Sequence, residues 1–240
     1  MMLSKSRAFV LHHTKYGDNS IVLKVYCETE GKLSLITSKA RGKKGVMPPS
    51  LLNPLSLIEI IYYENNKGSL KRLKEVRPLY AYQSLNYDPV KSCITLFLAE
   101  VLHHVIHEEE SNKALFNYCF NSFTNFDTQT SGWANFHILF LFGLSKFLGF
   151  YPEKQSSLKE YFDLLNGVYS QTAPPHPHFL EGKSLALWYQ LYESERLSET
   201  SAFSRNERQI LLKSLLEYYR LHIRDFGELK SLDILGQVLD

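Results

Sequence analysis

The stretch "SIVLKVYCETEGKLSLITS", residues 20–38, decides the fold of the first third of the chain. In its first half every second residue from Ile21 to Cys27 is apolar, and Val22, Lys24 and Tyr26 lie between them. That alternation is typical of a strand with one buried face. The "ETEG" that follows is a turn, and "GKLSLITS" then repeats the strand pattern. The stretch therefore predicts two consecutive strands.

Similar short runs flank this pair, and turn residues separate them in "YGDNS" and "ENNKG". They are "RAFVLHH", "LSLIEIIYY" and "SLKRLKEV", which brings the expected number of strands in residues 1–80 to five. Five short strands in so short a segment predict a closed or nearly closed barrel of the OB type, whose open face and loops hold single strands or oligosaccharides. A small sandwich is the alternative.

Beyond Asp88-Pro89, a good N-cap and first-turn pair, the apolar period changes from two to about 3.6. A capping box, Ser204 with Glu207, opens the last expected helix, and Asn166-Gly167 predicts a small hairpin near 160–171. The sequence thus predicts an α+β multidomain protein with an OB-type domain at 1–80 and an all-α domain with a small β-hairpin at 81–240. The helices are expected at about 89–109, 112–126, 132–149, 183–197 and 205–225.

Charge is distributed unevenly along the chain, although the whole carries only +2. Residues 1–80 hold 14 Lys and Arg against 6 Asp and Glu, a net charge of +8, and residues 81–240 hold 13 against 19, a net charge of −6. Such an asymmetry indicates that the N-terminal region binds an anionic partner, and nucleic acid is the expected one.

Several classes of protein are not expected. The three cysteines form no CxxC pair and are too few for a disulfide framework, which indicates a reducing compartment. No apolar segment suits a signal peptide or membrane span, so we expect a cytoplasmic protein. No nucleophile motif or acid/base pair is recognisable, so neither catalysis nor a cofactor is expected.

The stretch "TSKARGKKGVMPP", residues 37–49, follows the third expected strand. It fails the spacing of a nucleotide-binding P-loop, because Thr37 and Lys44 occupy positions that need Gly and Ser or Thr. A loop presenting several cations would instead contact a phosphate backbone without reading sequence, although a solvated charge run is the alternative. The residues predicted to contact DNA are Lys39, Arg41, Lys43 and Lys44 in the loop, Lys71, Arg72, Lys74 and Arg77 in the last strand, and Tyr26 as a base-stacking platform.

A metal site is the main alternative that points to an enzyme. In "HHVIHEEE" His103 and His107 are four residues apart, as are His104 and Glu108, so each pair could share a helix face. The HExxH order and a third ligand cluster are both missing, and histidine is common near a helix C-terminus for electrostatic reasons. No bound metal is expected.

The segment "SRAFVLHHTKYGDNSIVLKVYCETEGKLSLITSKARGKKG" resembles the N-terminal block of the RecO family of DNA repair and recombination mediators. "LLNPLSLIEIIYYENNKGSLKRLKEVRPL" continues the resemblance. Later landmarks are "LFGLSKFLGFYPE", "YFDLLNGVYS" and "LHIRDFGELKSLDIL". Many family members carry a four-cysteine zinc module after the first of these landmarks, and this chain has no cysteine there.

The resemblance implies an OB barrel, a helical C-terminal domain, binding to single- and double-stranded DNA, and annealing of complementary strands. It also implies help in loading RecA onto DNA covered by single-stranded-DNA-binding protein, with RecR and the acidic, apolar tail of that protein as partners. Leu232 replaces the Arg that commonly follows "LKS" in the family. Nearby cations that could meet the acidic tail are Arg220, Arg224 and Lys230. An interaction scaffold whose barrel binds an acidic protein is the alternative function.

Overall fold

The computed structural model describes residues 2–38, 46–64, 70–107, 110–153, 159–197 and 203–239. Its contacts divide the chain into two compact units. The first unit comprises Met1–Thr128 together with Leu229–Val238, and the second comprises Gln129–Glu228 with the last two residues. Each unit is described by itself below. None of the described helices is long and apolar enough to cross a membrane.

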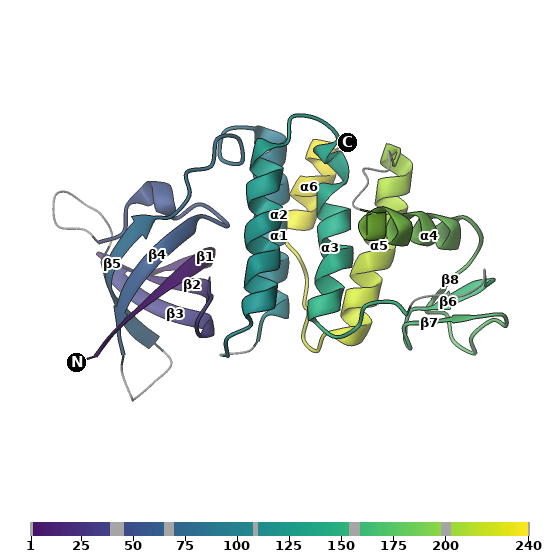
Figure 1. The fold of residues 1–240 in the computed structure, drawn as a ribbon, viewed down its shortest axis with the longest axis horizontal. Coiled ribbons are helices and arrows are strands. Elements are labelled where there is room, and N and C mark those ends of the chain that lie inside the picture. The colour runs from purple at the N-terminus through teal and green to yellow at the C-terminus, as the bar shows by residue number, and fades with distance from the viewer. Residues whose placement is uncertain are drawn as a thin grey trace. The chain divides into compact units, whose positions relative to one another are not determined.

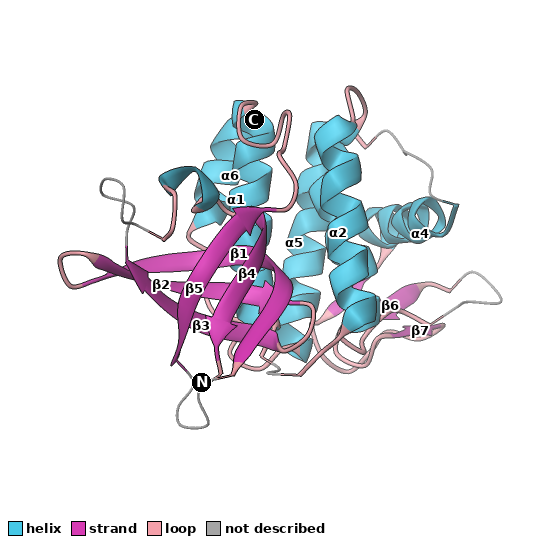
Figure 2. Cartoon of the chain, turned by 60° about the vertical axis from the view of Figure 1, so that its left-hand side comes forward, coloured by secondary structure: helices cyan, strands magenta, loops and turns pink. Residues whose placement is uncertain are grey.

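The first unit begins with a closed barrel in the strand order β1-β2-β3-β5-β4 (Figures 1 and 2). Neighbouring strands are antiparallel except β3 and β5, which form a short parallel ladder. This architecture confirms the predicted five-stranded OB-type barrel. The strands are β1 (Leu3–Tyr16), β2 (Ser20–Cys27), β3 (Gly31–Ser38), β4 (Leu57–Tyr63) and β5 (Leu70–Pro78), with a short 3-10 helix, η1 (Pro49–Leu51), between β3 and β4.

The barrel interior is filled by the apolar residues that alternate along each strand. Ile21, Leu23, Val25 and Cys27 of β2 are all completely buried, as the alternation in the sequence predicts. Tyr62 of β4 is also buried in this core, whereas its neighbour Tyr63 points the other way and stays partly exposed. Apolar burial of this kind stabilises a domain by about 25 cal/mol per Å² removed from water.

Three helices complete the first unit: α1 (Pro89–Val105), α2 (Lys113–Thr128) and α6 (Ser231–Leu239). Helix α1 begins as predicted, since the Asp88 carboxylate accepts hydrogen bonds from the amides of Val90 and Lys91. Helix α6 was not predicted. Its first amides are capped from α1, because the Glu100 carboxylate accepts hydrogen bonds from the amides of Lys230 and Ser231 at 3.0 and 2.9 Å.

The barrel packs on α2 through aromatic rings. Phe9 of β1 lies 5.3 Å from Phe116 and 5.7 Å from Phe123 between ring centroids. Beside them the Arg7 guanidinium donates two hydrogen bonds to Glu28, at 2.8 and 2.6 Å, and stacks over Phe116. The barrel, α1 and α2 thus belong to one compact unit, whose internal contacts extend beyond residue 80.

A buried polar cluster joins the end of α2 to the segment before α1. The Asp127 carboxylate, 3% exposed, accepts hydrogen bonds from the amides of Gln83, Ser84 and Leu85 at 2.7–3.0 Å. The buried Lys91 ammonium donates to the Phe126 carbonyl at 2.9 Å. Because every amide in this segment has an ionised acceptor, the connection between barrel and helices is fixed by charge-assisted hydrogen bonds.

The Asp127 cluster predicts acid sensitivity. Burial by itself raises the pKa of Asp127, but the three amide hydrogen bonds outweigh it and hold the pKa below its ordinary value of 3.8. A carboxyl group with a lowered folded-state pKa contributes stability above its unfolded pKa and loses it as the pH falls through the folded value. The urea concentration at half-unfolding should therefore decrease as the pH is lowered from 5 to 2.5. A urea midpoint that stays constant over that range would contradict the prediction.

The second unit contains α3 (Phe136–Phe147), α4 (Gly182–Leu197), α5 (Arg205–His222) and a three-stranded sheet. Both halves of the predicted capping box are present at the start of α5. The predicted hairpin is also present, with Gly167 at φ +69° in its turn, and a third strand that was not predicted pairs with it. The strands are β6 (Tyr161–Asp163), β7 (Val168–Ser170) and β8 (Phe179–Leu180), and a short 3-10 helix, η2 (Trp133–Asn135), precedes α3.

Candidate nucleic-acid interface

The outer face of β1, β2, β3 and β5 carries polar side chains with Val22, Ile36 and Leu70 among them. Strand registers place these side chains in rows that run across the sheet, since directly paired residues point to the same face. We call this surface the outer barrel face. Its rows are His12–Lys24–Ser34–Leu70, Thr14–Val22–Ile36–Arg72 and Tyr16–Ser20–Ser38.

Arg72 and Lys74 of β5 are the predicted contact residues that the structure leaves available. Both side chains are exposed, and no described residue forms an ion pair with either. Arg72 pairs with Ile36 across the β3–β5 ladder and so belongs to the outer barrel face. Two exposed cations that have no counter-ion within the described part of the chain suit contact with a phosphate backbone.

Lys71, also predicted to contact DNA, is largely enclosed and ion-paired in the structure. Its ammonium forms an ion pair with Glu30 and lies 5.2 Å above the Tyr62 ring, and only 18% of the side chain is exposed. The Tyr62 hydroxyl donates to the same carboxylate. Lys71 points to the opposite side from its neighbour Arg72 because side chains alternate along a strand. The positive charge of Lys71 is therefore largely balanced by Glu30 at the end of the barrel.

Arg77 is exposed but already paired. Its guanidinium lies 2.6 Å from the Glu75 carboxylate, and its side chain is 69% exposed. An exposed ion pair of this kind contributes about 0–1 kcal/mol and opens readily. Arg77 can therefore exchange its carboxylate for a phosphate at little cost, but its net contribution to the positive field is small.

The structure contradicts the prediction that Tyr26 is a base-stacking platform. Tyr26 does point away from the barrel core, as the alternation predicts, but α2 covers that part of the outer surface. The ring is 1% exposed, lies 5.8 Å from Phe116 and donates its hydroxyl hydrogen to the Asn112 carbonyl. No base can reach it while α2 is packed there.

The four cations of the loop after β3, Lys39, Arg41, Lys43 and Lys44, lie outside the described residues. The positions that flank them are described. Ser38 and Val46 line a cavity of about 360 Å³ at this end of the barrel, together with Arg72. Its other lining residues are Ser20, Ile36, Thr37 and Leu73.

The His103 side chain of α1 lies near a lysine and another histidine. The His103 ring lies 5.6 Å from His12, and burial, assisted by Lys32 and His12, lowers the pKa of His103 to about 4. Among the described ranges, no group of three or more His, Cys, Asp or Glu side chains is arranged to hold a metal ion, and Glu108 of the metal alternative lies outside those ranges. A positively charged neighbourhood disfavours a metal cation further.

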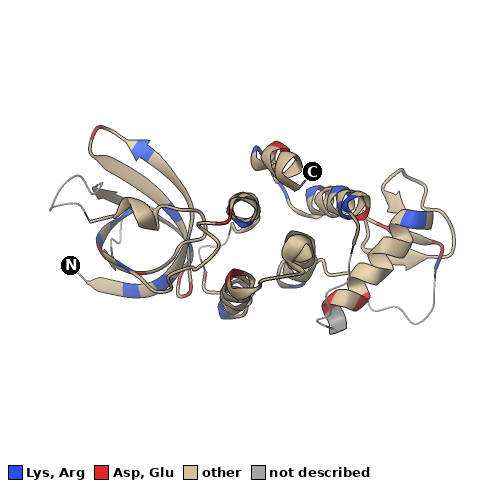
Figure 3. Cartoon of the chain, turned by 90° about the horizontal axis from the view of Figure 1, so that it is seen from above, with Lys and Arg blue, Asp and Glu red and all other residues tan. Residues whose placement is uncertain are grey.

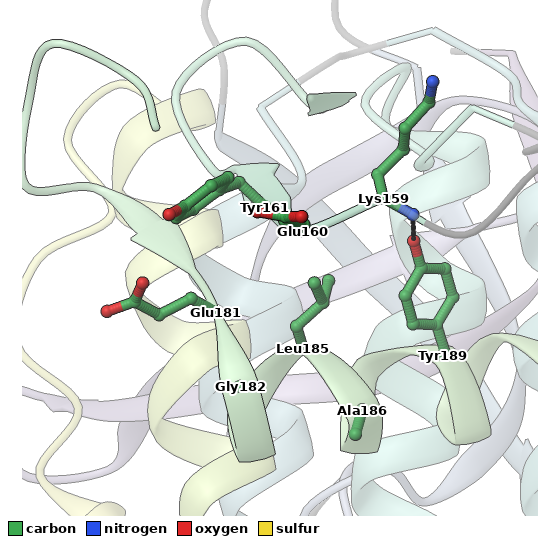
Figure 4. Close-up of a pocket in the computed structure, with 8 residues that line it drawn as sticks. All are labelled: Lys159, Glu160, Tyr161, Glu181, Gly182, Leu185, Ala186 and Tyr189. Atoms are coloured by element: carbon green, nitrogen blue, oxygen red, sulfur yellow. Dashed lines mark hydrogen bonds between the residues drawn. The ribbon is translucent and has the colours of Figure 1, made fainter. Parts of the chain in front are cut away.

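The second unit has a cavity of about 480 Å³ between its small sheet and α4 (Figure 4). Leu185, Ala186 and Tyr189 of α4 line one side, and the Tyr189 hydroxyl accepts a hydrogen bond from the Lys159 amide at 3.0 Å. Two exposed carboxylates, Glu160 and Glu181, lie on its rim. With Lys159 as the one cation in its lining, the cavity offers an acidic peptide no net positive charge.

The three cations predicted to meet an acidic partner are all exposed. Arg220 and Arg224 lie at and just after the end of α5 in the second unit, where the Arg224 side chain is 96% exposed. Lys230 belongs to the first unit, where its amide is bound by Glu100.

A closed OB-type barrel followed by a helical region with a small sheet defines a class of two-part proteins, and family models match both parts. "Recombination protein O N terminal" matches residues 1–82, and "Recombination protein O C terminal" matches residues 86–233. The chain belongs to the RecO family of DNA repair proteins.

Relatives cover the whole chain. A DNA repair protein RecO of Bacteroides fragilis is 39% identical over 100% of both chains, and one of Azobacteroides pseudotrichonymphae is 36% identical over 100% of both. A DNA repair protein RecO of Flavobacterium psychrophilum is 34% identical over 99% of both. These similarities confirm the resemblance found in the sequence.

Proposed function

We propose that the chain binds single- and double-stranded DNA through the outer barrel face and anneals complementary strands. The observation that carries the proposal is the exposure of Arg72 and Lys74 without ion-pair partners among the described residues, on a barrel segment whose net charge is +8. Figure 3 marks the lysines and arginines along the barrel strands. Family membership supports the same assignment.

Contacts of this kind are made to phosphates and leave base sequence unread. Two complementary strands repel each other through their phosphates, so a cationic surface that holds one strand while admitting the other lowers the barrier to pairing. The process needs no cofactor and breaks no covalent bond. We therefore propose a non-enzymatic mediator in the cytoplasm.

We also propose that RecR, RecA and the acidic tail of single-stranded-DNA-binding protein are partners in loading RecA onto covered DNA. Arg220 and Arg224 are the cations of the second unit offered for the tail, with Lys230 in the first. We do not assign the tail to the Figure 4 cavity, because its lining includes Glu160 and Glu181 and only one cation, Lys159.

The double variant Arg72→Ala/Lys74→Ala tests the outer barrel face. We expect it to bind single strands about 3- to 10-fold more weakly, taking about 0.3–0.7 kcal/mol for each exposed ion pair with phosphate. Its annealing rate should fall with its affinity. Fluorescence anisotropy of a labelled oligonucleotide and an annealing assay measure the two effects.

The matched control is Lys183→Ala/Lys213→Ala, which removes two exposed cations from the second unit. This control removes as many positive charges as Arg72→Ala/Lys74→Ala does. If the position of the charges governs DNA binding, the control should keep most of the wild-type affinity for DNA. Equal losses in the two double variants would show that total charge alone governs binding. The alternative of a scaffold for an acidic protein predicts no retention of DNA by the wild-type chain.

A further inference from the structure

Tyr16 is an exposed aromatic residue at the far end of β1. Its side chain is 58% exposed, and it pairs with Ser20 of β2, which in turn pairs with Ser38 of β3. Adjacent strands lie about 4.8 Å apart, so Tyr16 is one strand spacing from Ser20. Both serines line the cavity of about 360 Å³ described above. Tyr16 therefore lies on the outer barrel face, one strand away from a residue that lines the cavity.

The cavity is chemically suited to an anion. Arg72 supplies a guanidinium, and Ser20, Thr37 and Ser38 supply hydroxyl groups. Thr37 is only 5% exposed, and its buried Oγ1 atom has no hydrogen-bond partner among the described residues. A buried polar atom without a partner costs about 1–3 kcal/mol. A ligand oxygen that enters the cavity would satisfy this hydroxyl.

We propose that this end of the barrel is a nucleotide subsite for single-stranded nucleic acid. In it the Tyr16 ring stacks on an unpaired base, and Arg72 with the Thr37 hydroxyl holds the adjacent phosphate. The proposal rests on the proposed DNA-binding function and adds to it a means of distinguishing single strands from duplex. Bases in a duplex are stacked on one another and unavailable to a protein ring, whereas an unpaired base presents a free face.

The test compares Tyr16→Ala with the wild-type full-length chain on a single-stranded oligonucleotide and on a duplex of the same length. Loss of one stacked base should weaken single-strand binding about tenfold, equivalent to about 1.4 kcal/mol. Duplex binding should change less than twofold, because only phosphates are held there. Tyr16→Phe keeps the ring and should restore single-strand binding.

Tyr87→Ala is the matched control. Tyr87 is also exposed, at 78%, but it precedes α1 beside the N-cap Asp88 and lines no part of the cavity. The Tyr87→Ala variant should bind the single strand and the duplex as tightly as the wild type does. Equal losses for Tyr16→Ala on single strand and duplex, or an equal loss for Tyr87→Ala, would overturn the subsite.

Two further measurements separate the possible failures. Thr37→Val removes the buried hydroxyl at similar volume and should weaken single-strand binding a few-fold without lowering the urea midpoint. If Tyr16→Ala and Thr37→Val both bind single strands like the wild type, the subsite is wrong while the proposed DNA binding stands. If the wild-type chain itself binds neither nucleic acid, the proposed function fails first.

Discussion

Replacing Lys39, Arg41, Lys43 and Lys44 together by alanine is expected to weaken binding to single-stranded DNA about 10- to 100-fold, whatever the base sequence. These four cations follow the third strand, next to Ser38 of the outer barrel face. Each phosphate neutralised on a single strand contributes about −0.7 to the slope of the logarithm of affinity against the logarithm of salt concentration. Losing four contacts should flatten that slope by about 2.8.

The measurement is a salt titration of oligonucleotide anisotropy with the quadruple variant and the wild type. Oligonucleotides of different sequence should lose affinity equally, because phosphate contacts carry no sequence information. The slope for Lys183→Ala/Lys213→Ala serves as the charge control. An unchanged slope in the quadruple variant, or a loss confined to one base sequence, would contradict the predicted role of the loop.

Replacing Asp127 by alanine is expected to destabilise the first unit by about 3–5 kcal/mol. The substitution leaves the amides of Gln83, Ser84 and Leu85 without their acceptor. Unpaired buried donors cost far more than the net contribution of the bonds themselves. Urea unfolding followed by circular dichroism measures the effect.

Asp127→Asn is the matched variant, because it keeps the shape and one acceptor oxygen but removes the charge. It should be destabilised less than Asp127→Ala, and its midpoint should depend less on pH between 5 and 2.5. If Asp127→Ala unfolds at the wild-type midpoint, the account of the cluster is wrong.

Local sequence patterns were sufficient for the barrel and for most helices. Alternation fixed which residues of β2 face inward, and the caps at Asp88 and Ser204 marked helix starts correctly. These signals depend on neighbours within a few residues. Helix α6 lacked such a signal, since the group that caps it, Glu100, lies about 130 residues earlier in the chain.

The candidate site was less predictable, because exposure depends on what packs on a strand from elsewhere. Alternation placed Tyr26 on the correct face, but only the folded chain shows that α2 covers that face. The charge of Lys71 gave no sign that Glu30 neutralises it across the barrel. Tyr16 is the first residue of the turn "YGDNS", and the local pattern gives no sign that strand pairing extends as far as Tyr16 and Ser20.

The central claim is that nucleic acid lies on the outer barrel face. Photocrosslinking tests it most directly, using the full-length chain and a single strand that carries iodouracil at successive positions, followed by mass spectrometric mapping of the crosslinked peptides. The account predicts crosslinks concentrated in residues 12–24, 34–44 and 70–74, with Tyr16 among the modified side chains. Crosslinks confined to residues 129–228 would contradict it.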